Sequence, residues 1–101
     1  MRERTSIMDP RQITGASRAM KAMSHPLRLQ ILCLLGEQEA SVQDIVDKVG
    51  TTQSNISQHL ALMREKGVLR TRRDANRIYY RLSDVRTLQI LVHVRDLFSG
   101  F

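Results

Sequence analysis

Two short helices joined by a tight turn are the feature that most constrains what this chain can fold into. A favoured cap at Ser41, followed by apolar residues at helical spacing, predicts a helix over residues 42–49. Gly50-Thr51 forms a turn, and Thr52 is the preferred cap of a second helix that runs to about Glu65. Two short helices with a glycine-containing turn between them are the layout of a helix-turn-helix.

Two predicted β-strands follow and carry most of the positive charge. Residues 68–72 and 77–82 read as strands because apolar and polar side chains alternate in the second, and residues 73–76 form the loop between them. The chain has 16 Lys and Arg against 10 Asp and Glu, a net charge of +6, and residues 51–81 alone hold seven basic and two acidic residues. A concentrated basic surface attracts a polyanion, most often nucleic acid. A basic hairpin after a helix-turn-helix is a wing.

The rest of the chain supplies three more predicted helices. One starts at Asp9-Pro10 and breaks at Ser24, the next runs from Pro26 to Gly36, and the last runs from about Asp84 to Phe98 with Ser83 as its cap. Residues 1–9 are expected to form a flexible tail, in which Arg2 and Arg4 add weak phosphate contacts. With 101 residues, the chain has room for a single domain, residues 10–101, mainly helical with one small β-hairpin.

The last helix is apolar on two sides. Leu88, Leu91 and Val92 form one stripe, and Ile90, Val94 and Leu97 form another. One stripe can pack against its own domain, and the other needs a partner, for which a two-fold dimer is the commonest solution. The alternative is one wide stripe with incidental aliphatic residues.

Uncharged polar side chains cover the predicted outer face of the helix that ends near Glu65. No Lys, Arg, Asp or Glu occurs from Thr51 to Met63, whereas ordinary solvated helix faces carry such charges. Because Gln and Ser can hydrogen-bond to base edges in the major groove, the pattern predicts DNA reading by this helix. The candidate contacts are Thr52, Gln53, Ser54, Asn55, Ser57, Gln58 and His59 on the helix, and Arg72, Arg73, Asn76 and Arg77 on the wing. The alternative for His59 is packing beside Met63.

Three segments resemble the ArsR–SmtB family of bacterial repressors. They are Lys21-Ala22-Met23-Ser24-His25-Pro26-Leu27-Arg28-Leu29-Gln30-Ile31-Leu32, Ser54-Asn55-Ile56-Ser57-Gln58-His59-Leu60 with Met63-Arg64 and Gly67-Val68-Leu69, and Arg77-Ile78-Tyr79-Tyr80-Arg81-Leu82. The resemblance spans residues 16–99 and implies a cytoplasmic winged helix-turn-helix homodimer that binds a two-fold symmetric DNA operator and acts as repressor or counter-repressor. It also implies a dimer interface through the first and last helices. The candidate interface residues are Ile13, Met20, Leu88, Leu91, Val92 and Arg95.

Cys33 is the only cysteine. Its surroundings resemble a sulfur- and redox-responsive subgroup that includes HlyU-like, BigR-like and YgaV-like regulators. The subgroup's second cysteine position is occupied here by Ser99, which cannot form a disulfide or polysulfide bridge. Two interpretations of Cys33 stay open: a buried packing residue, or a single thiol that responds to a small sulfur compound or oxidant.

Several other classes of protein are disfavoured. His25, His59 and His93 have no metal-ligand spacing, so we expect neither a metal nor a cofactor. The chain lacks paired carboxylates, a nucleophile–base arrangement and a glycine-rich phosphate loop, which argues against an enzyme. No apolar run approaches the ~18 residues of a membrane span, and the amino terminus lacks the apolar core of a secretory signal. The competing hypothesis is a winged helix that binds protein or RNA.

Overall fold

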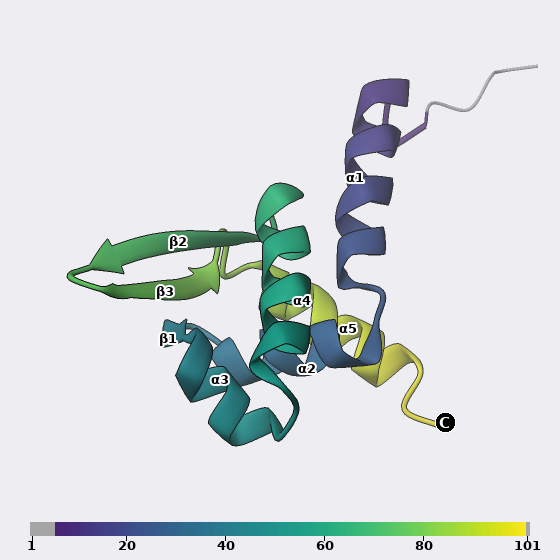
Figure 1. The fold of residues 1–101 in the computed structure, drawn as a ribbon. Helices are drawn as coiled ribbons and strands as arrows, with labels where there is room; N and C mark the ends of the chain where they lie inside the picture. The colour runs from purple at the N-terminus through teal and green to yellow at the C-terminus, as the bar shows by residue number, and fades with distance from the viewer. Residues whose placement is uncertain (1–5, 101) are drawn as a thin grey trace, which may run out of the picture.

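The computed structural model describes residues 6–100, a group of helices with a small antiparallel sheet at one side (Figure 1). The elements in chain order are α1 (Pro10–Met23), α2 (Pro26–Leu35), β1 (Ala40–Ser41), α3 (Val42–Val49), α4 (Gln53–Glu65), β2 (Leu69–Asp74), β3 (Arg77–Leu82) and α5 (Thr87–Leu97) (Figure 1). This order confirms the predicted helix-turn-helix followed by a wing. Arg2 and Arg4 lie outside the described residues, so the structure does not address their predicted phosphate contacts.

Local hydrogen bonds explain where the first, third and fourth helices begin. The Asp9 carboxylate accepts from the backbone N–H of Gln12, whose side chain accepts in return from the N–H of Asp9. Ser41 and Asp44 make the same reciprocal pair at the start of α3. The Thr52 hydroxyl accepts from a backbone N–H three residues later at the start of α4. Each side chain satisfies a backbone donor that the helix leaves unpaired, as expected from the sequence.

The sheet contains a strand that the sequence pattern did not reveal. Its strand order is β1-β3-β2, and Ala40 and Ser41 of β1 pair with Tyr80 and Tyr79 of β3. The hairpin is also longer than predicted, because pairing continues to Asp74 opposite Arg77. The four-residue loop predicted over 73–76 is therefore wrong. The turn contracts to residues 75 and 76, with Ala75 in the left-handed region at φ 54° that such tight turns require.

The predicted start of the last helix is also wrong. Ser83 does not cap it; α5 begins at Thr87, and Arg86 precedes it without a side-chain cap. The Asp84 carboxylate instead accepts from the backbone N–H and the guanidinium of Arg86, which holds residues 84–86 in a turn. The same hydrogen bonds lower the pKa of Asp84 to about 2. This turn postpones the helix by three residues.

The core lies between α2, α3, α4 and the base of the wing. Its fully buried large side chains are Ile31, Leu32, Ile45, Ile56, Leu60, Met63 and Leu82. From α1 only Ala22 is buried, and no residue of α5 is buried. Helix α1 projects away from the other helices (Figure 1). The radius of gyration is 15.8 Å, whereas a compact domain of this length has about 13 Å. The protomer therefore leaves its first and last helices outside the core.

Candidate nucleic-acid interface

Helix α4 presents a polar face to solvent because its opposite face forms the centre of the core. Ile56, Leu60 and Met63 are all 0% exposed, which fixes the rotation of the helix about its own axis. On the other side Gln53, Ser54 and Gln58 are exposed and Ser57 is half-buried. The structure thus brings the four predicted base-reading side chains together on the solvent-facing side of the first turns of α4.

Thr52 and Asn55 have a structural part at the start of α4. The Thr52 hydroxyl accepts from the Asn55 backbone N–H at 3.1 Å, and the Asn55 side-chain amide donates to the Thr51 hydroxyl at 3.2 Å. These bonds hold the turn before the helix. They leave the backbone N–H groups of the first turn pointing outward, where a helix favours an anion.

His59 lies apart from the other predicted DNA contacts. Its ring is 4.5 Å from the ring of His25, and its Nδ1 accepts from Nη1 of Arg28 at 3.3 Å. Burial, followed by the charges of His25 and Arg28, lowers the pKa of His59. The side chain therefore joins α4 to the start of α2, and the structure does not place it on the polar face. Its observed neighbours are His25, the residue that caps α2, and Arg28 within α2.

The tip of the wing carries exposed basic side chains. Arg73, Asn76 and Arg77 are exposed, and neither arginine makes an ion pair with any residue from 6 to 100. The hairpin extends away from α4 on the side of α3 (Figure 1). These three predicted contacts are therefore exposed at the end of a projecting hairpin.

Arg72 differs from its neighbours because an acidic side chain already holds it. Its Nε donates to Oε2 of Glu39 at 3.1 Å, its Nη2 donates to Oε1 of the same carboxylate, and its guanidinium lies 4.8 Å from the ring centre of Tyr79. Oδ2 of Asp74 lies 3.7 Å from Nη1 of Arg72. The hydrogen bond from Arg72 lowers the pKa of Glu39. Sequence analysis missed Glu39, which precedes Arg72 by 33 residues. Arg72 therefore differs from Arg73 and Arg77, which make no ion pair within residues 6–100.

Cys33 lies on the outer side of α2 and is exposed, so its interpretation as a buried packing residue is wrong for the protomer. Ile31, Leu32 and Leu35 face the core, and Cys33 points to the other side of the same helix. Ser99 follows α5, and its hydroxyl donates to the Asp96 carbonyl at 3.2 Å.

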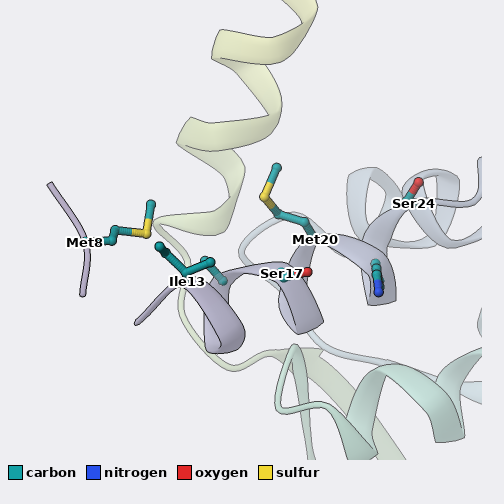
Figure 2. A pocket seen from close by; sticks show the side chains of 7 residues that line it. Met8, Ile13, Ser17, Met20 and Ser24 are labelled. Atoms are coloured by element: carbon teal, nitrogen blue, oxygen red, sulfur yellow. The ribbon is translucent and has the colours of Figure 1, made fainter. Parts of the chain in front are cut away.

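Helix α1 carries an unpartnered apolar surface. Ile13 and Met20 are 53% and 66% exposed, and with Met8 they line a groove of about 510 Å³. Figure 2 shows the three side chains pointing to the same side of the helix. Two of the predicted interface residues therefore lie together on this surface.

Helix α5 is divided in the way that its two stripes suggested, with one difference. Leu88 and Leu91, which the sequence placed in the dimer interface, instead pack against the core of their own protomer because this side of α5 faces the domain, whereas Val92 is 42% exposed. Ile90, Val94 and Leu97 form the more exposed surface. Arg95 is exposed and bonds to the neighbouring Asp96.

Other kinds of site receive no support from the described residues. Within residues 6–100, no three His, Cys, Asp or Glu side chains lie close enough together to hold a metal ion. In the same range, no helix combines the length and the apolar character needed to cross a bilayer.

Comparisons with known proteins agree with this architecture. The sequence profile of the family described as "Bacterial regulatory protein, arsR family" matches residues 25–71. The biofilm growth-associated repressor of Xylella fastidiosa is 37% identical over 81 residues, which are 80% of this chain and 71% of that protein. The solved structure of HlyU from Vibrio cholerae superposes with a TM-score of 0.79 at 34% identity, and covers 91% of this chain and 99% of its own.

A second solved structure is described as a homodimer. It is the winged helix-turn-helix DNA-binding domain Mb0332 from Mycobacterium bovis, with a TM-score of 0.75 at 30% identity. The match covers 92% of this chain and 88% of that one.

Proposed function

The chain belongs to the ArsR family of bacterial regulatory proteins, and from that premise we propose that it is a homodimeric, sequence-specific DNA-binding regulator of transcription in the cytoplasm. The observation that carries this proposal is the uncharged polar face of α4, which lies opposite three fully buried residues and beside a basic wing. A helix held in this way can enter the major groove with a fixed set of side chains facing the bases.

In this proposal Gln53, Ser54, Ser57 and Gln58 read base edges. A glutamine amide can pair with adenine through two hydrogen bonds, and a serine hydroxyl can donate or accept with several bases. The backbone N–H groups after Thr52 face a phosphate at the start of the helix. These contacts supply sequence preference because the base edges differ, whereas the phosphates do not.

The wing supplies contacts to the DNA backbone or to an adjacent minor groove. Arg73, Asn76 and Arg77 are the proposed contacts, because they are exposed at the tip and neither arginine has an acidic partner within the described residues. Such contacts set affinity and register, and they make binding depend on salt concentration.

The dimer is proposed to form through α1 and α5. Ile13, Met20 and Val92 are exposed apolar residues of the predicted interface, and Ile90, Val94 and Leu97 extend the surface on α5. Leu88 and Leu91 support this surface from beneath, since they pack against the core, and Arg95 lies at its edge. A two-fold dimer presents two copies of α4, so its operator has two symmetric half-sites about one helical turn, ~10 bp, or a multiple apart.

We assign any response to a sulfur compound or oxidant to Cys33 alone. The thiol is exposed on α2, and the hydroxyl of Ser99 cannot complete a bridge. We therefore propose single-thiol modification as the chemical form of such a signal. The test is DNA binding before and after polysulfide treatment and again after added thiol, with Cys33→Ser as the variant that must not respond.

The regulatory function is tested by fluorescence anisotropy with a labelled duplex from upstream of the protein's own gene. We expect tight binding that weakens steeply as salt rises, with a scrambled duplex bound far more weakly. Ser57→Ala should cost about 1–3 kcal/mol and relax the sequence preference, whereas Gln30→Ala, at an exposed position of α2 outside the proposed interface, serves as the control. Equal affinity for both duplexes, or preference for RNA of the same sequence, would contradict the proposal and favour the competing interaction module.

A further inference from the structure

A basic pocket of about 310 Å³ lies where α1, α2 and α4 meet, apart from the polar face of α4. Ala22 and Leu62 supply apolar lining. The remaining lining residues are Arg18, Lys21, Arg28 and Lys66. Sequence analysis did not assign these four cations to the DNA interface, and the proposed function does not use them.

The charge of this pocket is almost uncompensated. Four of its six lining residues are cationic and none is acidic. Among them only Lys66 makes an ion pair within the described residues, at 3.9 Å to the exposed Glu65. Like charges gathered in one concave site repel each other, so an anion placed among them is stabilised by all of them at once.

Arg28 gives the pocket a fixed donor group. Its Nη1 donates to His59 of α4, and its Nη2 donates to the Lys21 carbonyl of α1 at 3.2 Å. Its Nε is buried and has no hydrogen-bond partner in the described part of the chain. A guanidinium has five N–H donors, of which two are used here. An unsatisfied buried donor is uncommon and costly in native proteins, so this cation gains more from a nearby anion than a solvated arginine would.

The Arg18 side of the pocket stays accessible in the proposed dimer, whereas Lys21 also lines the groove formed by Ile13 and Met20. Arg18 and Ala22 are four residues apart and share one face of α1. Ile13 and Met20, which belong to the proposed dimer surface, lie on the opposite face of that helix. A partner protomer seated on Ile13 and Met20 therefore does not cover Arg18.

We infer that this pocket is a binding site for phosphate groups. Arg28 donates to one oxygen of the phosphate, and the cationic groups of Arg18, Lys21 and Lys66 neutralise its remaining charge. The phosphate can come from a small polyphosphate compound or from the DNA backbone beside α4, and only the second source rests on the proposed function. Either one would stabilise the junction that Arg28 and His59 form between α2 and the proposed recognition helix.

The first arm of the test uses the full chain without DNA and inorganic tripolyphosphate as the probe. We expect saturable binding by isothermal titration calorimetry and a rise in Tm above that caused by sodium chloride of equal ionic strength. Arg18→Ala and Lys66→Ala should each weaken this binding about tenfold, as expected for loss of one charge-assisted contact. Arg11→Ala is the matched control, since it removes an exposed charge from the same helix outside the pocket.

The second arm measures how DNA affinity depends on salt for the same three variants. If the DNA backbone supplies the phosphate, Arg18→Ala and Lys66→Ala each lower the slope of log K against log salt by about 1.8 for the dimer, two contacts at about 0.9 each, and Arg11→Ala does not. If a small compound supplies it, tripolyphosphate binds saturably and the DNA slopes are unchanged. Both outcomes support the site and identify its ligand.

The inference is overturned if tripolyphosphate acts only as salt does and the three variants also share the wild-type DNA slope. The first arm needs no DNA binding, so loss of the proposed function would not be mistaken for loss of this site. Circular dichroism of each variant checks that the fold is retained, which we expect because the substituted side chains are exposed.

Discussion

Arg72 and Arg73 are neighbours on β2, but their side chains lie on opposite faces of the wing. Arg72 pairs across the hairpin with Tyr79 and is held by Glu39, whereas Arg73 pairs with Ile78 and has no acidic partner within residues 6–100. A guanidinium that already binds a carboxylate on both of its edges gains less from a phosphate. We therefore regard Arg72 as a residue that positions the wing.

Salt dependence of DNA binding separates the two roles. Arg73→Ala should lower the slope of log K against log salt by about 1.8 for the dimer, because each protomer loses one phosphate contact and each contact contributes about 0.9. Arg72→Ala and Glu39→Gln should weaken binding while leaving the slope unchanged, and the exchanged pair Glu39→Arg with Arg72→Glu should recover affinity. A slope for Arg72→Ala equal to that of Arg73→Ala would show that Arg72 contacts phosphate directly.

Exposure of Cys33 predicts its reactivity. Because the thiol lies on the outer side of α2, one equivalent per chain should react with 5,5′-dithiobis(2-nitrobenzoic acid) in the native protein, with no denaturant added. Cys33→Ser should give no reaction, which serves as the control. Reaction only after addition of urea would mean that the assembled protein covers this residue.

At the scale of elements, two imidazole nitrogens accept hydrogen bonds at the junction of α2 and α4. Nδ1 of His25 accepts from the backbone N–H of Leu27 and so caps α2. Nδ1 of His59 accepts from Arg28, since a guanidinium can only donate. A proton on Nδ1 of His59 removes this acceptor and places a positive charge beside Arg28.

Stability should therefore depend on pH through His59. Its pKa in the folded chain lies below the ordinary value of 6.5, so the unfolded chain takes up the proton first. The stabilisation is fully present above pH 6.5 and is lost as the pH falls through the lowered pKa. Urea unfolding from pH 7.5 down to pH 5 should show a falling midpoint, with a smaller fall in His59→Gln. The exposed His93→Gln should behave as wild type, and an equal fall in all three proteins would assign the effect to other groups.

At the scale of the whole molecule, the protomer has too little core for the apolar surface that it carries. Helix α1 contributes one buried residue and α5 none, while Ile90, Val94 and Leu97 remain 53%, 47% and 77% exposed. Exposed apolar residues gathered on two projecting helices are typical of a surface that a partner covers. Helix α1 contributes to the elongated shape because it projects away from the other helices (Figure 1).

Ile90→Glu tests this dimer surface. It places a charge in the interface twice in a two-fold dimer, and it removes about 1.5 kcal/mol or more of apolar burial from each protomer. We expect the dimer dissociation constant in sedimentation equilibrium to rise ~100-fold or more, together with loss of tight DNA binding. Gln89→Glu, also on the exposed part of α5, should leave the dimer intact. Unchanged dimerisation of Ile90→Glu would place the interface elsewhere.

The interfaces differ in how far the sequence could predict them. The base-reading residues of α4 could be identified because helical spacing alone separates Ile56, Leu60 and Met63 from the polar side. The sequence could not show that His59 and Arg72 differ from the other predicted DNA contacts. Their hydrogen-bond partners, Arg28 and Glu39, lie 31 and 33 residues away in the chain. The sequence placed Leu88 and Leu91 in the dimer interface because periodicity shows that a helix has two apolar sides. Periodicity does not show which of the two sides packs against the core of the same protomer.

Local sequence by itself determined where α1, α3 and α4 begin. Asp9, Ser41 and Thr52 cap helices through hydrogen bonds to residues three positions away, so the chain needs no distant contact to specify these boundaries. Tertiary structure alone decided the pairing of β1 with β3, the Glu39–Arg72 ion pair, the Arg28–His59 contact and the exposure of Cys33. The physical reason is the range of the interactions: a cap is satisfied within one turn of backbone, whereas these contacts exist only after the core has brought distant surfaces together.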